Sequence, residues 1–185
     1  MGLLILLGIV VALALWAVSI YNGLVRRKNL VAEGWSGIDA QLKRRADLIP
    51  NLVETVKGYA GHERETLENL TRLRGQGQAQ SDVAARAQTE RAITAAIGRL
   101  VAVAEAYPQL RASENFQSLQ KELAEVEDQI QLARRYYNGA TRDFNVMVEQ
   151  FPSNLVANGG GFKPAPFFQI EDGADRAVPQ VSLNT

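Results

Sequence analysis

The first hydrophobic pattern along the chain is an unbroken apolar run near its N-terminus. From Leu3 to Ile20 the sequence reads LLILLGIVVALALWAVSI, with no charge and no strongly polar side chain except that of Ser19. At about 1.5 Å per residue, a helix over this run is roughly 27 Å long, close to the thickness of the hydrocarbon core of a bilayer. The run therefore predicts a membrane-spanning helix.

A cleaved signal peptide is the alternative interpretation of the same run. Such a leader carries positive charge before its apolar stretch and ends at a small-x-small cleavage site. The alanines of Ala12-Leu13-Ala14 resemble that site, but no Lys or Arg precedes the run, and apolar residues continue beyond it. We therefore favour a retained anchor over residues 1–20, with Trp16 and Tyr21 at the membrane interface.

The longest amphipathic pattern lies between residues 113 and 151. Apolar residues recur there at alternating spacings of three and four over five heptads. The stripe consists of Phe116, Leu119, Leu123, Val126, Ile130, Ala133, Tyr137, Ala140, Phe144, Met147 and Phe151. Its 3.5-residue period is typical of coiled coils and of helices that pack nearly antiparallel. Pro152 marks the end of this helix.

A second helix is predicted over residues 82–107, because Asp82 is a suitable N-cap and Pro108 stops the helix. The region before it keeps one heptad phase from residue 35 to residue 73, but Pro50 interrupts it. A proline in a helix interior costs about 3 kcal/mol or more, whereas one in the first turn costs little. With Asp47 as the N-cap, we predict a break near residues 45–48, and a single kinked helix is the alternative.

Four amphipathic helices are thus predicted, over residues 21–46, 48–74, 82–107 and 113–151. The short connections between them favour an up-down-up-down bundle. After Phe151, the glycines of 158–161 and several prolines predict an irregular tail. The expected architecture is all-α: a transmembrane anchor at 1–20 that continues into an antiparallel four-helix bundle at 21–152, then an extended tail at 153–185.

Composition and charge restrict the possible functions. The 20 basic and 20 acidic residues cancel, which argues against a nucleic-acid-binding protein. The chain has no cysteine and one histidine, His62, so thiol catalysis, cysteine-ligated metal and a histidine-based triad within one chain are excluded. The Glu-x-x-His pattern of carboxylate di-metal bundles is also missing. We expect no catalytic, metal or cofactor site, and we interpret His62 as a surface residue.

Three consecutive cations, Arg26, Arg27 and Lys28, follow the anchor directly. By the positive-inside rule, such a cluster keeps the following segment in the cytoplasm. The three side chains also lie within reach of lipid headgroups. We therefore expect a single-pass protein with its bundle on the cytoplasmic side.

Several strings resemble the LemA family. They are Tyr21-Asn22, Trp35, the decapeptide RRADLIPNLV at 44–53, TVKGYA at 55–60, EAYPQL at 105–110, ARRYYN at 133–138, Phe151-Pro152 and the segment 161–168. The resemblance covers about residues 20–168. It implies a membrane-associated four-helix bundle of the bacterial inner membrane with no established catalytic activity. Some members have a lipoprotein-like leader with a cysteine where this chain has Val18-Ser19-Ile20, which leaves the side of the membrane open.

The decapeptide at 44–53 has a structural and a functional interpretation. Structurally, its charged residues make a local ion pair and a helix cap. Functionally, an up-down bundle brings the turn at 44–50 and the turn at 107–111 to the same membrane-distal tip. We therefore predict an interaction surface at that tip, formed by Arg44, Arg45, Asp47, Pro50, Tyr107 and Pro108.

The same topology returns the C-terminal tail to the membrane. Phe162, Phe167 and Phe168 flank Lys163, and aromatic rings beside a basic residue bind well at a membrane interface. The alternative is that these rings pack on the bundle or on a neighbouring subunit.

The expected function is that of a non-enzymatic membrane scaffold whose copies associate to organise or shape the bilayer. The alternative is a membrane-tethered adaptor that presents its bundle tip to a partner such as a membrane protease. The expected partners are the lipid bilayer, further copies of the chain and a protein at the tip.

Overall fold

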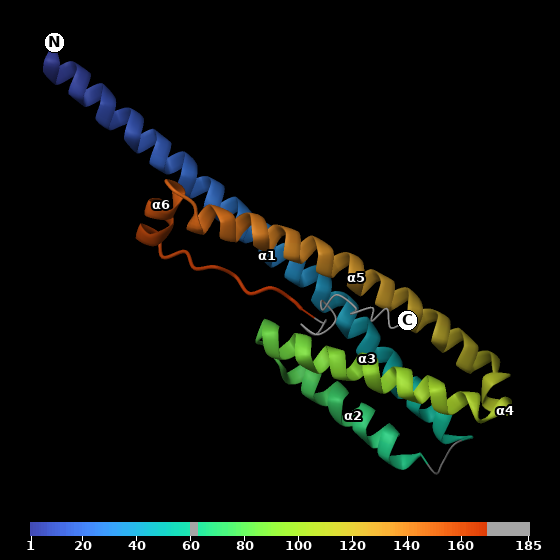
Figure 1. Ribbon diagram of the computed structural model, residues 1–185. Coiled ribbons are helices and arrows are strands. Elements are labelled where there is room, and N and C mark those ends of the chain that lie inside the picture. Colours follow the sequence, from blue (N-terminus) through green and yellow to red (C-terminus); the bar gives the residue numbers. More distant parts are fainter. Residues whose placement is uncertain (60–62, 170–185) are drawn as a thin grey trace, which may run out of the picture. The chain divides into compact units, whose positions relative to one another are not determined.

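The computed structural model describes residues 1–59 and 63–169, and every regular element within them is a helix (Figure 1). The helices are α1 (Gly2–Lys57), α2 (Arg64–Ala79), α3 (Val83–Glu105), α4 (Pro108–Arg111), α5 (Glu114–Glu149) and α6 (Ser153–Gly159). The all-α class is confirmed, with a long N-terminal apolar helix followed by helices that pack antiparallel. His62 and the end of the predicted tail lie outside the described residues.

The chain forms two compact units. Unit 1 comprises Met1–Arg45 and Lys121–Phe167, and unit 2 is built mainly from Ala46–Gln120. The boundaries lie inside α1 and α5, so each of these helices contributes to both units.

In unit 1, α1 and α5 pack antiparallel at close range. A Cβ atom on Gly34 would lie 3.0 Å from the Cα atom of Tyr137, tighter than most side-chain contacts, so the two helices approach each other closely at this glycine. At Gly23 the neighbouring atom is the Cε atom of Met147, the far end of a flexible side chain, which would lie 2.8 Å from an added Cβ atom. Further along, Arg45 donates a 2.7 Å hydrogen bond to Glu127. These three contacts fix the register of the two helices.

The segment after α5 folds back over the helix pair. Ser153 donates to the carbonyl of Met147 at 2.7 Å, and α6 places Ala157 in a core cluster with Leu24, Phe144 and Val148. Gly161, at φ +71°, then turns the chain into an extended segment, because that conformation strains other residues. We call residues 162–166 the strap. The tail expected to be irregular over residues 153–185 thus begins with a helix, α6.

The strap is held by polar contacts to α5. Asn145 donates to the carbonyl of Ala165 at 2.9 Å, and the Ala165 N–H donates back to the Asn145 side chain at 2.7 Å. The Tyr137 hydroxyl donates to the carbonyl of Pro166 at 2.7 Å. An extended segment cannot satisfy its own backbone groups, so these bonds supply partners that a helix would find internally.

The predicted break near residues 45–48 is wrong. α1 continues without interruption to Lys57, with Pro50 inside it, as Figure 1 shows. Pro50 has no N–H, so the carbonyl of Ala46 lacks its usual donor four residues later. Arg74 of α2 supplies the missing bond, because its Nε donates to the Ala46 carbonyl at 2.7 Å. The turn expected at 44–50 instead follows Lys57.

In unit 2, α3 packs beside α2, and the predicted caps are present. Asp82 accepts a 2.8 Å hydrogen bond from the Ala85 N–H, and Pro108 opens α4 after α3 has ended at Glu105. A buried ion pair joins Arg86 to Glu90 at 2.8 Å, and Arg86 also donates to the carbonyl of Gly77 near the end of α2. The hydrogen bond from Arg86 to Gly77 joins α3 to α2.

The Ala46–Arg74 contact predicts a coupling between two substitutions. Arg74→Met removes the donor to a buried carbonyl, so we expect the free energy of unfolding to fall by about 1–3 kcal/mol. In a Pro50→Ala background the new N–H of residue 50 bonds that carbonyl, and the loss should be smaller. Chemical denaturation followed by circular dichroism measures both losses in a double-mutant cycle.

Arg72→Met is the matched control, because exposed Arg72 bonds only to Asn69 and Gln76 on its own helix. Its effect should be small and independent of residue 50. Equal losses for Arg74→Met in both backgrounds would contradict the role that we give to Arg74.

Candidate functional site

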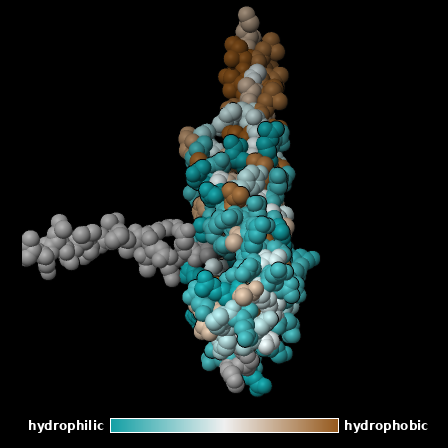
Figure 2. Space-filling view, turned by 90° about the vertical axis from the view of Figure 1, so that its right-hand side faces the viewer, coloured by the Kyte–Doolittle hydropathy of each residue, from teal (hydrophilic) through white to brown (hydrophobic). Residues whose placement is uncertain are grey.

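The N-terminal part of α1 is the most exposed apolar surface of the described chain. An 18-residue window of this helix has the length and composition of a membrane span, and none of it is buried. In Figure 2 it stands out as a brown end above a mostly teal body. Soluble monomers rarely expose so large an apolar patch, because water disfavours it. The helix therefore indicates membrane anchoring.

Most residues expected at the membrane interface surround the end of this segment. Trp16 and Tyr21 are each 45% exposed, and Arg26 and Lys28 are also exposed. Arg27 is half-buried instead, because its guanidinium lies 3.2 Å from the sulfur of Met147. Two of the three cations thus face solvent, and the third holds α1 against α5.

The three phenylalanines of the tail do not behave alike. Phe162 is half-buried, with its ring 5.5 Å from that of Tyr21 and with the Lys28 ammonium 5.9 Å from its centre. Phe168 is fully buried, so its expected place in the membrane interface is wrong. Phe167 is exposed. Packing on the protein, the alternative interpretation, describes Phe162 and Phe168.

The turn expected at 44–50 does not form. Pro50 lies seven residues before the end of α1, about two helical turns, so Arg44, Asp47 and Pro50 lie along a helix rather than in a turn. Arg44, Asp47, Pro50 and Pro108 are exposed, and Tyr107 is half-buried.

Arg45 is not an exposed interaction residue. Only 2% of its side chain is exposed, and it forms an ion pair with Glu127 of α5 at 2.7 Å. A buried guanidinium needs such a partner, because removing the partner leaves an uncompensated charge. The contact spans 82 residues of sequence, so the local spacing of the decapeptide gives no signal for it.

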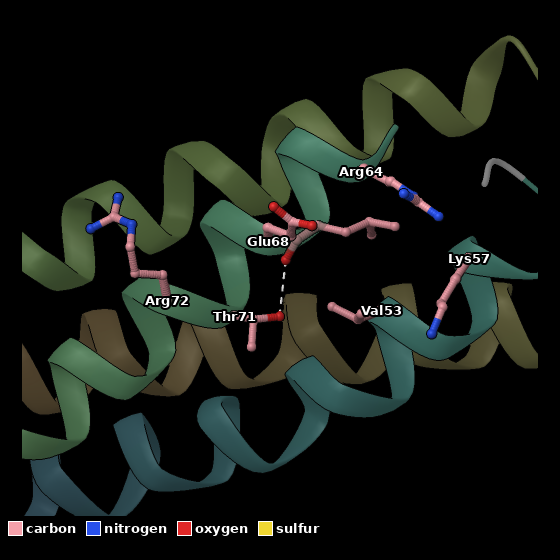
Figure 3. A pocket seen from close by; sticks show the side chains of 7 residues that line it. Val53, Lys57, Arg64, Glu68, Thr71 and Arg72 are labelled. Atoms are coloured by element: carbon pink, nitrogen blue, oxygen red, sulfur yellow. Dashed lines mark hydrogen bonds between the residues drawn. The ribbon is translucent and has the colours of Figure 1, made fainter. Parts of the chain in front are cut away.

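Sequence reasoning missed a basic groove in unit 2, because the end of α1 was misplaced. The groove encloses about 640 Å³ between the end of α1 and α2 (Figure 3). It is lined by Val53, Lys57, Arg64, Leu67, Glu68, Thr71 and Arg72. Lys57 and Arg64 lie at one end of the groove and Arg72 at the other, so its lining carries three cations and one carboxylate, that of Glu68. This charge balance suits an acidic partner segment.

Metal chemistry finds no donor set in the described part of the chain. Within residues 1–59 and 63–169, no group of three or more His, Cys, Asp or Glu side chains could hold a metal ion. The remaining features are the apolar N-terminal part of α1, the aromatic and basic residues around its end, the α1–α5 helix pair with its strap, and the basic groove. Together they define a membrane-anchored helical protein.

Comparison with known proteins identifies the family. The LemA family model matches residues 34–183, and the chain belongs to the LemA family. The chain is 26% identical over 184 residues to magnetosome protein MamQ 2 of Paramagnetospirillum magneticum, which covers 85% of this chain and 68% of that protein. It is 30% identical over 137 residues to Protein LemA of Metamycoplasma hominis, which covers 74% of this chain and 63% of that protein.

The strap predicts a late-ionising tyrosine. Burial raises the pKa of the Tyr137 hydroxyl above its ordinary value of 10.0. Because the folded state holds this proton more tightly, the associated stability is complete below pH 10.0 and is lost as the pH rises through the raised pKa. An absorbance titration of tyrosinate should show a late phase that Tyr137→Phe removes.

Tyr136→Phe is the control, since it changes the exposed neighbouring ring and keeps the contact with Pro166. The late phase should persist in this variant. A late phase that survives Tyr137→Phe would contradict the assignment.

Proposed function

We propose that this protein is a non-enzymatic membrane scaffold whose copies associate side by side to organise or shape the bilayer. One observation carries the proposal: α1 is a single helix from Gly2 to Lys57, so no linker separates the anchor from the helix pair of unit 1. Copies in one membrane therefore present the same surfaces at the same height, which favours regular lateral association.

The chemistry of the surface supports partners of this kind. The proposed partners are the lipid bilayer and further copies of the chain, and the zero net charge argues against nucleic acid. The cations Arg26 and Lys28, exposed directly after the anchor, support a cytoplasmic position for the helical units in a bacterial inner membrane.

The scaffold proposal predicts that the full-length protein is oligomeric in lipid. We expect mass measurement of the protein in bilayer nanodiscs, assembled over a range of protein-to-lipid ratios, to give dimers or larger species. The control is an unrelated single-pass protein at the same ratios, which reports chance co-incorporation. A single-chain mass at every ratio would overturn the proposal.

The basic groove favours a second candidate function, a membrane-tethered adaptor for an acidic partner such as a segment of a membrane protease. A photo-crosslinker placed at Arg64 in living cells should then capture one abundant protein other than this chain, and Arg72→Glu should reduce that capture. A crosslinker at exposed Gln88 of α3 is the control position. Capture of mainly the chain itself from Arg64 would favour the scaffold instead.

A further inference from the structure

Two exposed stripes run along the helix pair of unit 1. The stripe on α1 consists of Arg26, Leu30, Glu33, Gly37, Ala40 and Arg44. The stripe on α5 consists of Glu125, Gln129, Leu132, Tyr136, Gly139 and Asp143. Both follow the alternating three-and-four spacing of packed helices, and all twelve residues are exposed except half-buried Gly139. This spacing places each set on one face of its helix, and the exposed large hydrophobic side chains of Leu30, Leu132 and Tyr136 lie within the two stripes.

Both stripes lie on the face of the pair that is turned away from the strap. The strap borders a hollow whose α1 wall includes Lys28, Ala32 and Trp35, and each of these residues follows a stripe residue by two positions. Two positions are about 200° around a helix, so the stripe is on the opposite side. On α5, strap-bound Asn145 follows stripe residue Asp143 by the same two positions.

The two stripes match each other in antiparallel register. Aligning Arg26 with Asp143 also aligns all the following pairs without a gap. They are Leu30 with Gly139, Glu33 with Tyr136, Gly37 with Leu132, Ala40 with Gln129 and Arg44 with Glu125. Opposite charges face each other at both ends of the alignment, and a large side chain meets a glycine twice between them.

The structure leaves room for these large-to-small contacts. A Cβ atom on Gly37 or Gly139 would meet no other atom within 4 Å, so both glycines border open space. Leu30 and Leu132 are 38% and 51% exposed, so each side chain is available to fill such a gap in a neighbouring molecule. This shape complementarity adds to the charge complementarity of the stripe ends.

We propose that a second copy of this chain docks on this face, with the α1 stripe of each copy packed against the α5 stripe of the other. This interface rests on the proposed self-association and names its surface. Each contact then occurs twice around a two-fold axis, which makes a closed dimer with four packed helices.

The shared membrane is compatible with this arrangement. A two-fold axis along the membrane normal places both anchors in one bilayer and keeps each residue at its own height. In one copy, Gly34 lies level with Tyr137 and Arg45 lies level with Glu127. The proposed pairs Gly37–Leu132 and Arg44–Glu125 differ from that register by about one helical turn or less, roughly 5 Å. Neither copy needs to move far into or out of the bilayer.

Cysteine crosslinking tests the interface, because the natural chain has no cysteine. Full-length Gly37→Cys and Leu132→Cys chains with different tags are co-expressed, purified in lipid vesicles and oxidised. Only contact between copies can link the two tags. The matched control pairs Ser36→Cys with Leu132→Cys, since exposed Ser36 lies one position outside the stripe. We expect a several-fold higher yield of linked heterodimer from the first pair.

Charge reversal tests the same surface without a covalent bond. Arg44→Glu should raise the dissociation constant of the dimer by about tenfold, because symmetry places the repulsion in the interface twice. Glu125→Arg should have the same effect, and the double variant should restore dimer formation. Lys43→Glu, on an exposed residue beside the stripe, is the control and should change little.

The outcomes separate this interface from the proposed function. Equal crosslinking from residues 36 and 37, or no rescue in the double variant, while the protein stays oligomeric, overturns the interface and leaves self-association intact. A monomer at every protein density overturns both. Circular dichroism of each variant shows whether its helices are retained.

Discussion

The continuity of α1 through Pro50 is the constraint on which the rest of the structure depends. A proline inside a helix leaves the carbonyl four residues earlier without a donor. Here that carbonyl belongs to buried Ala46, and Arg74 of α2 satisfies it. Because α1 can therefore continue to Lys57, Leu52 and Val56 remain in phase with the buried residues before the proline. The hydrogen bond that Pro50 cannot make within α1 is thus replaced by a hydrogen bond between α1 and α2.

The same continuity joins the membrane anchor directly to the folded helix pair. An apolar span followed by a flexible linker would only hold the protein near a membrane. In this chain the span and the first half of the helix pair are one helix, and Met147 of α5 packs against Gly23 and Arg27 just beyond the membrane interface. The membrane-adjacent turn of α1 is therefore also a packing surface of unit 1.

The sequence predicts those features whose determinants are local or periodic. The apolar positions predicted over residues 116–151 are buried at Phe116, Val126 and Ile130, and the Asp82 cap forms as expected. The predicted break near Pro50 is wrong because the donor that bonds the Ala46 carbonyl is Arg74, which lies 28 residues away in the sequence. The prediction of Arg45 as an exposed interaction residue is wrong because its partner Glu127 lies 82 residues away in the sequence. Propensity rules describe a residue and its neighbours, so a single long-range charged contact can reverse them.

Some glycines of the helix pair have close neighbours within one copy of the chain, and others have none. A glycine inside a helix costs roughly 0.5–1 kcal/mol relative to alanine, and a close packing contact at the glycine offsets that cost. At Gly34 the compensating contact is the backbone of Tyr137, and at Gly23 it is the flexible end of the Met147 side chain. At Gly37 and Gly139 the space beside the backbone is open. In the proposed dimer, Leu30 and Leu132 of the neighbouring copy lie against these two glycines, so the open space beside the glycines and the exposed leucines belong to one surface.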